Sequence, residues 1–588
     1  MKKHFDPRYR LFFLLIISLN IVLPLTLIGK DGEDPYIQTR NNILNFGQIY
    51  QAITERYVED VDPDKFIRAG INGMLDKLDP YTVYLEQEGK EELQLMTRGK
   101  YYGVGMRIQL RNGWATVAEQ PFANSPASRA GIREGDQIIE IDGKNTKDDP
   151  LDETAQRLRG AKKGSEVRIK IQRVGEEKPL DFTLIRDEIV ISDIEYVGFV
   201  EPGIGLIKLS RFNRGAGDQV REAVETLMDQ GLDGLIFDLR GNPGGLLDAA
   251  VEVAENFVSK GQMIVYTEGR NGQNRTDYRS AADPILGSTP LVILVDGYSA
   301  SAAEIVAGAI QDLDRGVIIG SETFGKGLVQ TVVPLDRRGE TQIKITTAKY
   351  FMPSGRLIQR PEVFDRGAGS VFKASGDTNE AAKEPIGEET KINENENGKK
   401  YTTKNDRPVN GGGGITPDVA VENFNLNRYE IELIRQSMFF NFSLNYVAEH
   451  HALDKDFVVT QETLDEFNKF VESKDFDYKP AGSEEVEKLA EIAKQNDCYE
   501  DIKPHLDAIL ARFEQAKQME RENSADHIKL FLKREIAGKL FGRDAYIETM
   551  FDSDLPLKRS VEVLKNPKEY NEILHVQLAE ADKGPSGK

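Results

Sequence analysis

Three segments between positions 238 and 333 carry the residues best suited to covalent chemistry. The first is DLRGNPGGLLDAA, 238–250, in which a buried strand ends at Leu239 and a glycine-rich turn opens a helix. Gly244 and Gly245 leave backbone N–H groups uncovered at the helix N-terminus, and such groups suit an oxyanion or a phosphate. Taken alone, the segment is also compatible with an ordinary tight turn.

The second segment is LVILVDGYSASAAEIVAGAIQD, 291–312, in which Ser301 follows a buried strand and begins a helix. This position brings the Ser301 hydroxyl to the carboxyl-terminal rim of the sheet. The Ala302 N–H lies in the first helical turn, where the helix dipole favours negative charge. Ser301 therefore has the position of a nucleophile, and equally that of an ordinary helix N-cap.

The third segment is GVIIGSETFGKGLVQTVV, 316–333, in which Lys326 follows a strand and a turn bounded by glycines. If the chain is extended here, Lys326, Leu328 and Gln330 share one face. Burial among apolar residues disfavours the ammonium. To act as a base near pH 7, the amine pKa must fall by about 3 units from about 10.4, or roughly 4 kcal/mol. Gln330 would orient the amine; the alternative is a solvated loop lysine.

The positions of histidine and cysteine narrow the chemistry. No histidine lies between positions 5 and 449, so a catalytic centre in that span works without imidazole, and a histidine-rich zinc site there is excluded. The single cysteine, Cys498, excludes an intrachain disulfide and a multi-thiolate metal site. A serine nucleophile, a lysine base and a glycine-rich oxyanion turn together make a Ser–Lys acyl-transfer site.

Charge and the N-terminus limit the partners and the compartment. The 588 residues carry a net charge of −21, which argues against nucleic acid as a partner. Residues 11–28 read LFFLLIISLNIVLPLTLI behind a basic flank, a pattern typical of an uncleaved signal anchor. We therefore expect a single-pass inner-membrane protein with its remaining residues in the periplasm. A cleaved signal peptide is the second choice, and a buried core helix the third.

Composition and periodicity divide the chain into six parts. The predicted order is a signal anchor, a helical segment, a small β-rich domain, an α/β core with a mostly parallel sheet, a low-complexity disordered insertion within that core, and a helical C-terminal region: 1–35, 36–98, 99–188, 189–361 with 411–424, 362–410, and 425–588. For the C-terminal region we expect either a platform for an adaptor or for homo-oligomerisation, or a stabilising wrap.

The β-rich domain has the features of a peptide reader. It opens with KYYGVGMRI, in which the loop Gly103, Val104 and Gly105 enters a strand. Such a loop can direct N–H groups at a terminal carboxylate, while the strand edge pairs with an extended peptide. An ordinary loop is the alternative for these three residues alone.

Several motifs, taken in order, resemble the carboxy-terminal processing peptidases, or tail-specific proteases. The resemblance spans about 40–424 and rests on LDPYTVYL, YYGVGM, SPASRAGIREGDQIIEIDG, DLRGNPGGLL, SASAAEI, FGKGLVQ, KYFMPSGRLIQ and GGITPD. It implies Ser301 as nucleophile, Lys326 as base, Gln330 as its orienting partner, and oxyanion donors at Ala302 and at Gly244 or Gly245.

The same resemblance implies a crotonase-like α/β core and a PDZ domain that binds nonpolar C-terminal tails of proteins at Gly103, Val104 and Gly105. It implies no metal and no cofactor. We therefore expect a periplasm-facing serine endopeptidase. Two alternatives stay open: a catalytically inactive PDZ scaffold with the same core, and an acyl-CoA enzyme of the crotonase type. CoA binding would identify the acyl-CoA enzyme. That alternative leaves the PDZ domain and the anchor unexplained.

Overall fold

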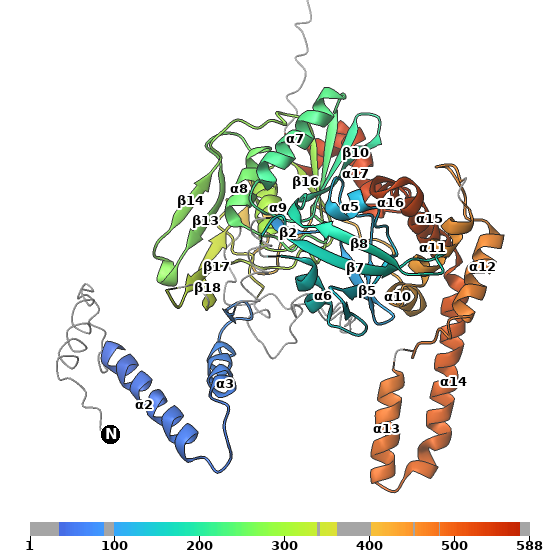
Figure 1. The fold of residues 1–588 in the computed structure, drawn as a ribbon. Coiled ribbons are helices and arrows are strands. Elements are labelled where there is room, and N and C mark those ends of the chain that lie inside the picture. Colours follow the sequence, from blue (N-terminus) through green and yellow to red (C-terminus); the bar gives the residue numbers. More distant parts are fainter. Residues whose placement is uncertain are drawn as a thin grey trace, which may run out of the picture. The chain divides into compact units, whose positions relative to one another are not determined.

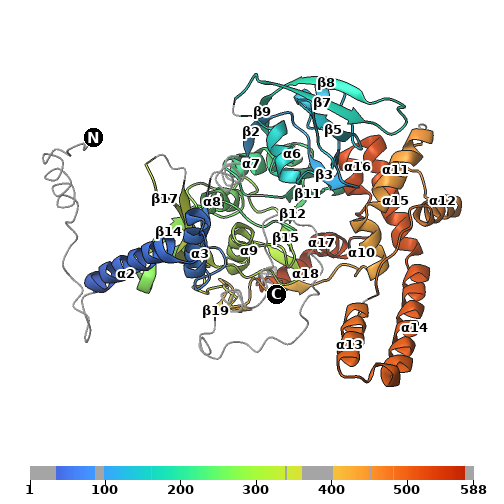
Figure 2. The ribbon, with the colours of Figure 1, turned by 60° about the horizontal axis from the view of Figure 1, so that its bottom comes forward.

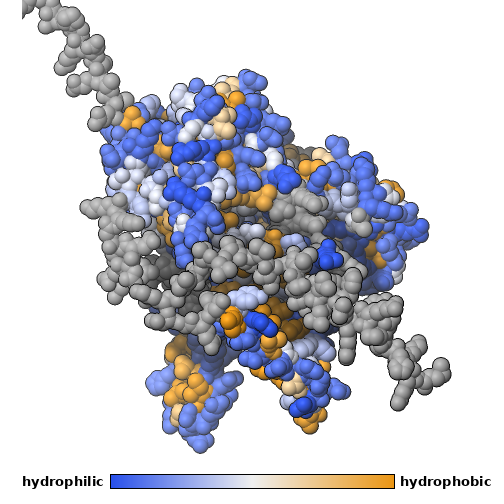
Figure 3. All heavy atoms as spheres, turned by 90° about the vertical axis from the view of Figure 1, so that its left-hand side faces the viewer, coloured by the Kyte–Doolittle hydropathy of each residue, from blue (hydrophilic) through white to orange (hydrophobic). Residues whose placement is uncertain are grey.

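A computed structural model describes residues 35–86, 99–160, 162–337, 341–360, 401–450, 453–480 and 482–576. The chain divides into two compact units, 1–74 and 75–588. Within the described residues no helix combines the length and the apolar character that a membrane span requires. The predicted anchor, 11–28, lies outside those residues. On the face drawn in Figure 3 hydrophilic side chains predominate among the described residues, with apolar ones in scattered groups.

The N-terminal unit contains helix α2 (Pro35–Arg56) and most of helix α3 (Pro63–Leu75). Tyr50 of α2 stacks on Phe66 of α3, with ring centroids 5.9 Å apart. The predicted helical segment 36–98 is therefore correct for its first two thirds. Its next part is wrong, because Val83–Leu85 forms strand β1.

The core of the second unit is a six-stranded sheet in the order β10 (Ile194–Glu201), β11 (Ile204–Leu209), β12 (Gly234–Asp238), β15 (Leu291–Val295), β16 (Val317–Gly320) and β21 (Val419–Ala420). Only the first pair is antiparallel. Every residue of β12, β15 and β16 is buried, as expected for parallel strands covered on both faces.

The two faces of this sheet are covered by helices from different parts of the chain (Figure 1). One face packs on α7 (Ala216–Asp229), α8 (Leu247–Glu255) and α9 (Ala302–Asp312), which lie between the strands in sequence. The other packs on α17 (Leu555–Lys565) and α18 (Pro567–Ile573), from the end of the chain. The C-terminal region therefore contributes a wall of the core.

A second sheet is wholly antiparallel and consists of β1, β18 (Gln342–Phe351), β13 (Met263–Glu268) and β14 (Thr276–Arg279), with β17 (Leu328–Pro334) also on β18. A short 3-10 helix, Arg270–Gly272, joins β13 to β14. The prediction of a mostly parallel sheet is thus correct for the first sheet and wrong for this one. The reason is that these strands follow one another, or return from 83–85, without a crossover helix.

The β-rich domain contains a sheet in the order β3 (Ile108–Arg111), β4 (Trp114–Val117), β5 (Gln137–Ile141), β7 (Glu166–Gln172) and β8 (Leu180–Ile185), with β6 (Lys144–Asn145) on β5. Helices α5 (Pro126–Ala130) and α6 (Leu151–Leu158) complete it, and β2 (Lys100–Gly103) pairs with β9 (Asp187–Val190). Strand β3 is an edge of this sheet, so one of its sides has no strand partner within the described residues.

The helical C-terminal region begins with α10 (Arg428–Arg435), α11 (Met438–Glu449), α12 (Gln461–Glu472), α13 (Ser483–Gln495), α14 (Tyr499–Asn523), α15 (Ala525–Phe541) and α16 (Arg543–Glu548). Stacked aromatic side chains form its core, with Phe439 and Phe467 at a centroid distance of 5.1 Å. Helices α13 and α14 lie side by side as a hairpin (Figure 2).

The predicted low-complexity insertion, 362–410, is shorter than expected at its C-terminal end. Residues Tyr401–Thr402 (β19) and Pro408–Val409 (β20) pair as an antiparallel hairpin, whereas 361–400 lie outside the described residues. Arg407 holds the hairpin to the core, since its guanidinium lies 2.6 Å from carboxylate oxygens of both Asp314 and Asp418. The low apolar content of this stretch concealed that a buried ion-pair network orders it.

Candidate active site

The three predicted segments meet at one edge of the parallel sheet. They follow the carboxyl ends of β12, β15 and β16, which are neighbours in the sheet and run in the same direction. Carboxyl ends of parallel neighbours share one edge, where α/β proteins place their ligands. The turn at Gly244, the nucleophile candidate Ser301 and the base candidate Lys326 are brought to that edge by strand order.

Ser301 is held in a strained backbone conformation. Its φ of 55° and ψ of −112° lie in a region that L-residues rarely adopt, at a cost of about 1–3 kcal/mol. The Glu304 carboxylate accepts the Ser301 N–H at 2.8 Å, and the Tyr350 hydroxyl lies 3.2 Å from the Ser301 carbonyl oxygen. An ordinary N-cap has extended backbone geometry, so capping alone does not explain this serine.

Glu304 joins the segment that contains Ser301 to the segment that contains Lys326. Its buried carboxylate accepts four hydrogen bonds: from the N–H groups of Ser301, Gly325 and Lys326 at 2.8, 2.6 and 2.9 Å, and from the Thr323 hydroxyl at 2.6 Å. Burial raises the pKa of Glu304 to about 7, although all four bonds favour the ionised form.

Sequence reasoning missed the part that Glu304 plays. The available signal was an acid three residues after a helix-initial serine, which is the spacing of a capping box. A second signal was its neighbourhood, AAEIVAGAI, because a lone carboxylate in such an apolar helix is buried and needs partners.

The Lys326 amine lies in dry surroundings. Its Nζ is 4.3 Å from the centre of the Tyr81 ring, and no ion pair joins it to any residue that the structure describes. Burial lowers the pKa of Lys326 from 10.5 to about 8; Lys344 lowers it further, whereas Glu304 and Asp79 act in the opposite direction. At pH 7 such an amine is neutral in about a tenth of the molecules.

The main chains of Ser301 and Lys326 are tied together, but their side chains are not bonded to each other. Besides Glu304, Tyr350 joins the two, since its hydroxyl also hydrogen-bonds the Lys326 carbonyl. Across the described part of the chain, no hydrogen bond connects the Ser301 hydroxyl with the Lys326 amine. The conformation thus holds both groups at one site with the proton-transfer contact unmade.

Gln330 has a different partner from the one expected. Its side-chain amide donates to the Thr346 hydroxyl at 3.4 Å, and no hydrogen bond with Lys326 occurs among the described residues. The alternation expected from Lys326 to Gln330 is interrupted, because β17 begins at Leu328 and its register with β18 shifts between Val329 and Gln330. The orienting part assigned to Gln330 stays a prediction.

One of the three candidate oxyanion donors, the Gly244 N–H, is already hydrogen-bonded within its own turn. The Gly244 N–H donates to the Asn242 side-chain oxygen at 2.8 Å, whereas the N–H groups of Gly245 and Ala302 have no acceptor in the described parts of the chain. Gly244 packs against the nucleophile, because a Cβ there would lie 2.9 Å from both the Ser301 Cβ and the Ala302 nitrogen. The available donors are therefore Gly245 and Ala302.

The predicted peptide loop precedes the open edge of the β-rich domain. Carbonyl groups of Val104 and Gly105 accept N–H bonds from α5 and its preceding turn, whereas the N–H groups of these two residues donate to no described acceptor. Gly105 has a φ of 77°, and a Cβ there would lie 2.3 Å from the Ser125 Cβ. The geometry leaves main-chain donors uncovered next to strand β3.

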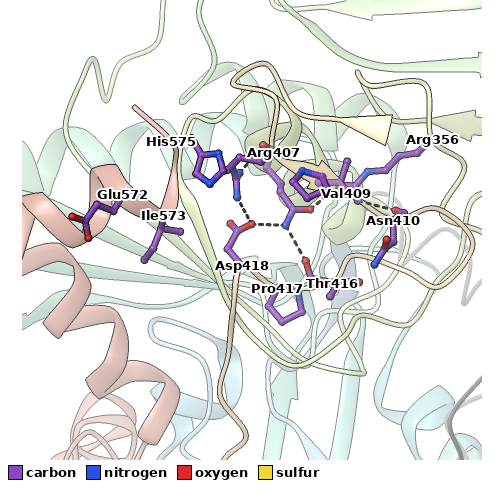
Figure 4. Close-up of a pocket in the computed structure, with 12 residues that line it drawn as sticks. Arg356, Arg407, Val409, Asn410, Thr416, Pro417, Asp418, Glu572, Ile573 and His575 are labelled. Atoms are coloured by element: carbon purple, nitrogen blue, oxygen red, sulfur yellow. Dashed lines mark hydrogen bonds and ion pairs between the residues drawn. The ribbon is translucent and has the colours of Figure 1, made fainter. Parts of the chain in front are cut away.

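A separate polar pocket of about 330 Å³ lies away from these residues (Figure 4). Arg407, Asp418 and Thr416 line it together with Glu572, Ile573 and His575 from the end of the chain. None of the predicted site residues lines this pocket. Of its two arginines, Arg407 holds the β19–β20 hairpin to the core, as described above, and Arg356 pairs with Asp312 at 2.7 Å.

Comparison with protein-family models assigns most of the described regions. Residues 203–364 match Peptidase family S41, and residues 118–173 match the PDZ domain. Residues 29–89 match the N-terminal domain of the activating protease CtpB, and 429–564 match the C-terminal helical domain of probable PDZ-proteases. These matches confirm the predicted fold class, an α/β core with a β-rich PDZ domain and helical regions at both ends.

Curated relatives agree with these matches. The chain is 35% identical to the carboxy-terminal-processing protease of Bartonella bacilliformis over 59% of this chain and 78% of the relative. It is 32% identical to the carboxy-terminal processing protease CtpA of Bacillus subtilis, over 60% and 75%. The solved photosystem II D1 C-terminal processing protease is 29% identical over 54% of this chain and 90% of its own, with a TM-score of 0.31. The chain belongs to the carboxy-terminal processing protease family: it is a serine-type endopeptidase with a PDZ domain.

Proposed function

We propose that this protease cleaves peptide bonds with a Ser301–Lys326 dyad and forms an acyl-enzyme on Ser301. The observation that carries the proposal is the dry Lys326 amine, whose main chain shares the Glu304 carboxylate with the strained Ser301. A lysine with a pKa near 8 is neutral often enough at physiological pH to accept a proton from serine.

The proposed chemistry conserves every proton. Neutral Lys326 takes the hydroxyl proton as the Ser301 oxygen attacks the substrate carbonyl, and the N–H groups of Gly245 and Ala302 stabilise the oxyanion. The Lys326 ammonium then gives its proton to the departing amine, and the C–N bond breaks. Neutral Lys326 next takes a proton from water as the water oxygen attacks the ester carbonyl. The Lys326 ammonium then returns this proton to the Ser301 oxygen as the ester C–O bond breaks. A rotation of the lysine side chain is needed first, and Gln330 is proposed to orient the amine afterwards.

Substrates are proposed to be proteins with nonpolar C-terminal tails. The uncovered N–H groups of Val104 and Gly105 suit a terminal carboxylate, and the open edge of β3 offers main-chain groups to an added strand. Ile108 on β3 packs against the apolar core of the domain and helix α6 lies beside the strand, so the groove has an apolar wall.

The proposed location is the inner membrane, with the protease in the periplasm, because residues 11–28 have the length and the basic flank of a signal anchor. An alkaline-phosphatase fusion after residue 35 tests this. Phosphatase activity in the membrane fraction is expected; activity only in the soluble periplasm would indicate cleavage. An oligomerisation or adaptor platform in the C-terminal region stays a prediction.

Degradation of a folded reporter with an unstructured apolar tail tests the dyad. The wild-type protein is expected to degrade it, and Ser301→Ala is expected to leave it intact. A fluorophosphonate probe should label the wild type at Ser301. A protein that binds the tail but neither reacts with the probe nor cleaves the reporter would instead be the inactive scaffold.

A further inference from the structure

A turn that lies before the PDZ domain in sequence reaches the catalytic lysine. The Asp79 carboxylate accepts the N–H groups of Tyr81 and Thr82 at 2.9 and 3.0 Å, and the Thr82 hydroxyl at 2.9 Å. The Thr82 hydroxyl in turn accepts the Thr346 N–H of β18 at 3.2 Å. Strand β1 follows directly and pairs with β18, with Val83 opposite Lys344. The turn is therefore fixed to the antiparallel sheet, whose strand β17 begins two residues after Lys326.

Tyr81 projects from this turn onto Lys326. Its ring centre is 4.3 Å from the Lys326 Nζ. Its hydroxyl is buried and makes no hydrogen bond with the residues that the structure describes. Burial, followed by the charges of Glu304 and Asp79, raises the pKa of Tyr81, which keeps the phenol neutral. The chain thus places a neutral aromatic ring directly on the amine, with no polar bond to account for its position.

We propose that Tyr81 is a positioning residue for the base: its ring closes the Lys326 amine off from solvent and sets its protonation beside the Ser301 segment. This deepens the proposed Ser–Lys mechanism and rests on it. The residue lies outside the S41-matched segment, 203–364, so the α/β core alone lacks this cover. The 79–82 turn is therefore part of the active site.

Two effects of the ring on Lys326 oppose each other. The ring face attracts an ammonium by about 0.5–2 kcal/mol, whereas exclusion of water destabilises that ammonium. The other charged groups that act on the amine are Asp79 on the same turn, Glu304 on α9 and Lys344 on β18. Burial is the largest cause of the lowered pKa of Lys326, and we take dehydration by the ring to outweigh the attraction of its face.

Three variants separate these effects. Tyr81→Phe keeps the ring without the hydroxyl, Tyr81→Leu keeps an apolar cover without a π face, and Tyr81→Ala admits water. The readout is the rate of fluorophosphonate labelling from pH 6 to 10.5, because this rate follows the neutral fraction of the base and needs no substrate. Tyr84→Ala, further along the same segment, is the matched control.

The wild type and Tyr81→Phe are expected to share a midpoint near pH 8, with Tyr81→Leu at or below it. For Tyr81→Ala we expect a midpoint roughly one pH unit higher, with labelling about eightfold slower at pH 7.5 and recovering above pH 10. A merely structural role would lower the rate equally at every pH.

An unchanged or lower midpoint in Tyr81→Ala overturns the proposal, as does a Tyr81→Phe profile identical to that of Tyr81→Ala, or the same shift in Tyr84→Ala. Labelling of Ser301→Ala at the wild-type rate would instead refute the proposed dyad. The two failures are therefore distinguishable within one experiment.

Discussion

Two lysines of this protein lie over aromatic rings but differ in their other contacts. Lys326 is 4.3 Å from the Tyr81 ring centre, and Lys539, on α15, is 4.2 Å from that of Phe440. Lys539 also pairs with two carboxylates, Glu134 at 2.8 Å and Glu535 at 3.0 Å. Lys326 pairs with none among the described residues, although Glu304 is close enough to accept its backbone N–H.

The two lysines therefore differ in their electrostatic surroundings: Lys539 has the contacts of a structural ion pair, and Lys326 has those expected of a base. Lys539 pairs with two carboxylates and joins the PDZ domain, through Glu134, to the helical region. At Lys326 the nearby carboxylate is saturated by three N–H groups and one hydroxyl, all of them neutral. Within the described residues no carboxylate pairs with the amine, and burial is the largest cause of its lowered pKa.

The largest expected effect is the loss of activity in Lys326→Arg. Arginine keeps the positive charge but does not lose a proton in proteins, so it cannot serve as the base. We expect reporter cleavage to fall on the order of 10⁴-fold or more. Lys539→Arg, the matched control, keeps its ion pairs and is expected to cleave within about twofold of the wild type. Comparable activity in both variants would remove the distinction between the two lysines.

The next effect is on stability, in Lys539→Met. Removal of the ammonium takes away the cation that hydrogen-bonds Glu134 and Glu535, although Arg111 stays near both. Breaking a buried pair in this way costs up to about 3–5 kcal/mol. Urea unfolding at pH 7 should show this loss, together with faster proteolysis at the junction between the PDZ domain and the helices. A stability equal to that of the wild type would show that the cluster does not hold the junction.

Lys326→Met is expected to raise the free energy of unfolding at pH 7, whereas Lys539→Met lowers it. The folded-state pKa of Lys326, about 8, lies below the ordinary 10.5, so wild-type stability falls as pH drops from about 10.5 to about 8. Below pH 8 the folded protein carries the full cost of burying the Lys326 ammonium, about 3 kcal/mol. The variant lacks this penalty and should be more stable at pH 7, with the difference shrinking towards pH 10. Destabilisation at pH 7 would contradict the dry-amine interpretation.

A smaller effect, about a hundredfold in kcat/KM, is expected for Glu304→Gln. The NH2 group of glutamine cannot accept hydrogen bonds, whereas both carboxylate oxygens of Glu304 do. Some of the four donors therefore lose their partner, and the Ser301 and Lys326 segments shift. The loss should lie mainly in kcat. Glu535→Gln removes a carboxylate from the other lysine and should stay within about twofold in the same assay. Equal losses in both variants would argue against a specific part for Glu304.

The parts of the site that came from the sequence are those carried by local pattern. The strand before Ser301, the helix that begins there and the strand before Lys326 were predicted, because continuous apolar runs and helix-start signals are short-range. Ser301 and Lys326 followed from their positions at strand ends. The Gln330 face was not predictable, because a register shift with β18 depends on the partner strand.

Other features depended on residues far apart in the chain. Strand β1 was expected to be helical, since only pairing with β18, some 260 positions away, makes it a strand. The 401–410 hairpin was assigned to a disordered insertion, because its ordering comes from Asp314 and Asp418 rather than from apolar content. The local composition of these two segments shows neither the pairing with β18 nor the ion pairs with Asp314 and Asp418.

The sequence by itself determined which residue types are available: a serine and a lysine at strand ends, no histidine between 5 and 449, and an ordered set of motifs. Only the tertiary structure decided the surroundings that govern reactivity. Protonation of a lysine depends on the water and charges within a few ångströms of its nitrogen, and here these are set by Tyr81, Glu304 and Lys344. Those residues come from three separate elements, so their convergence is a property of the fold.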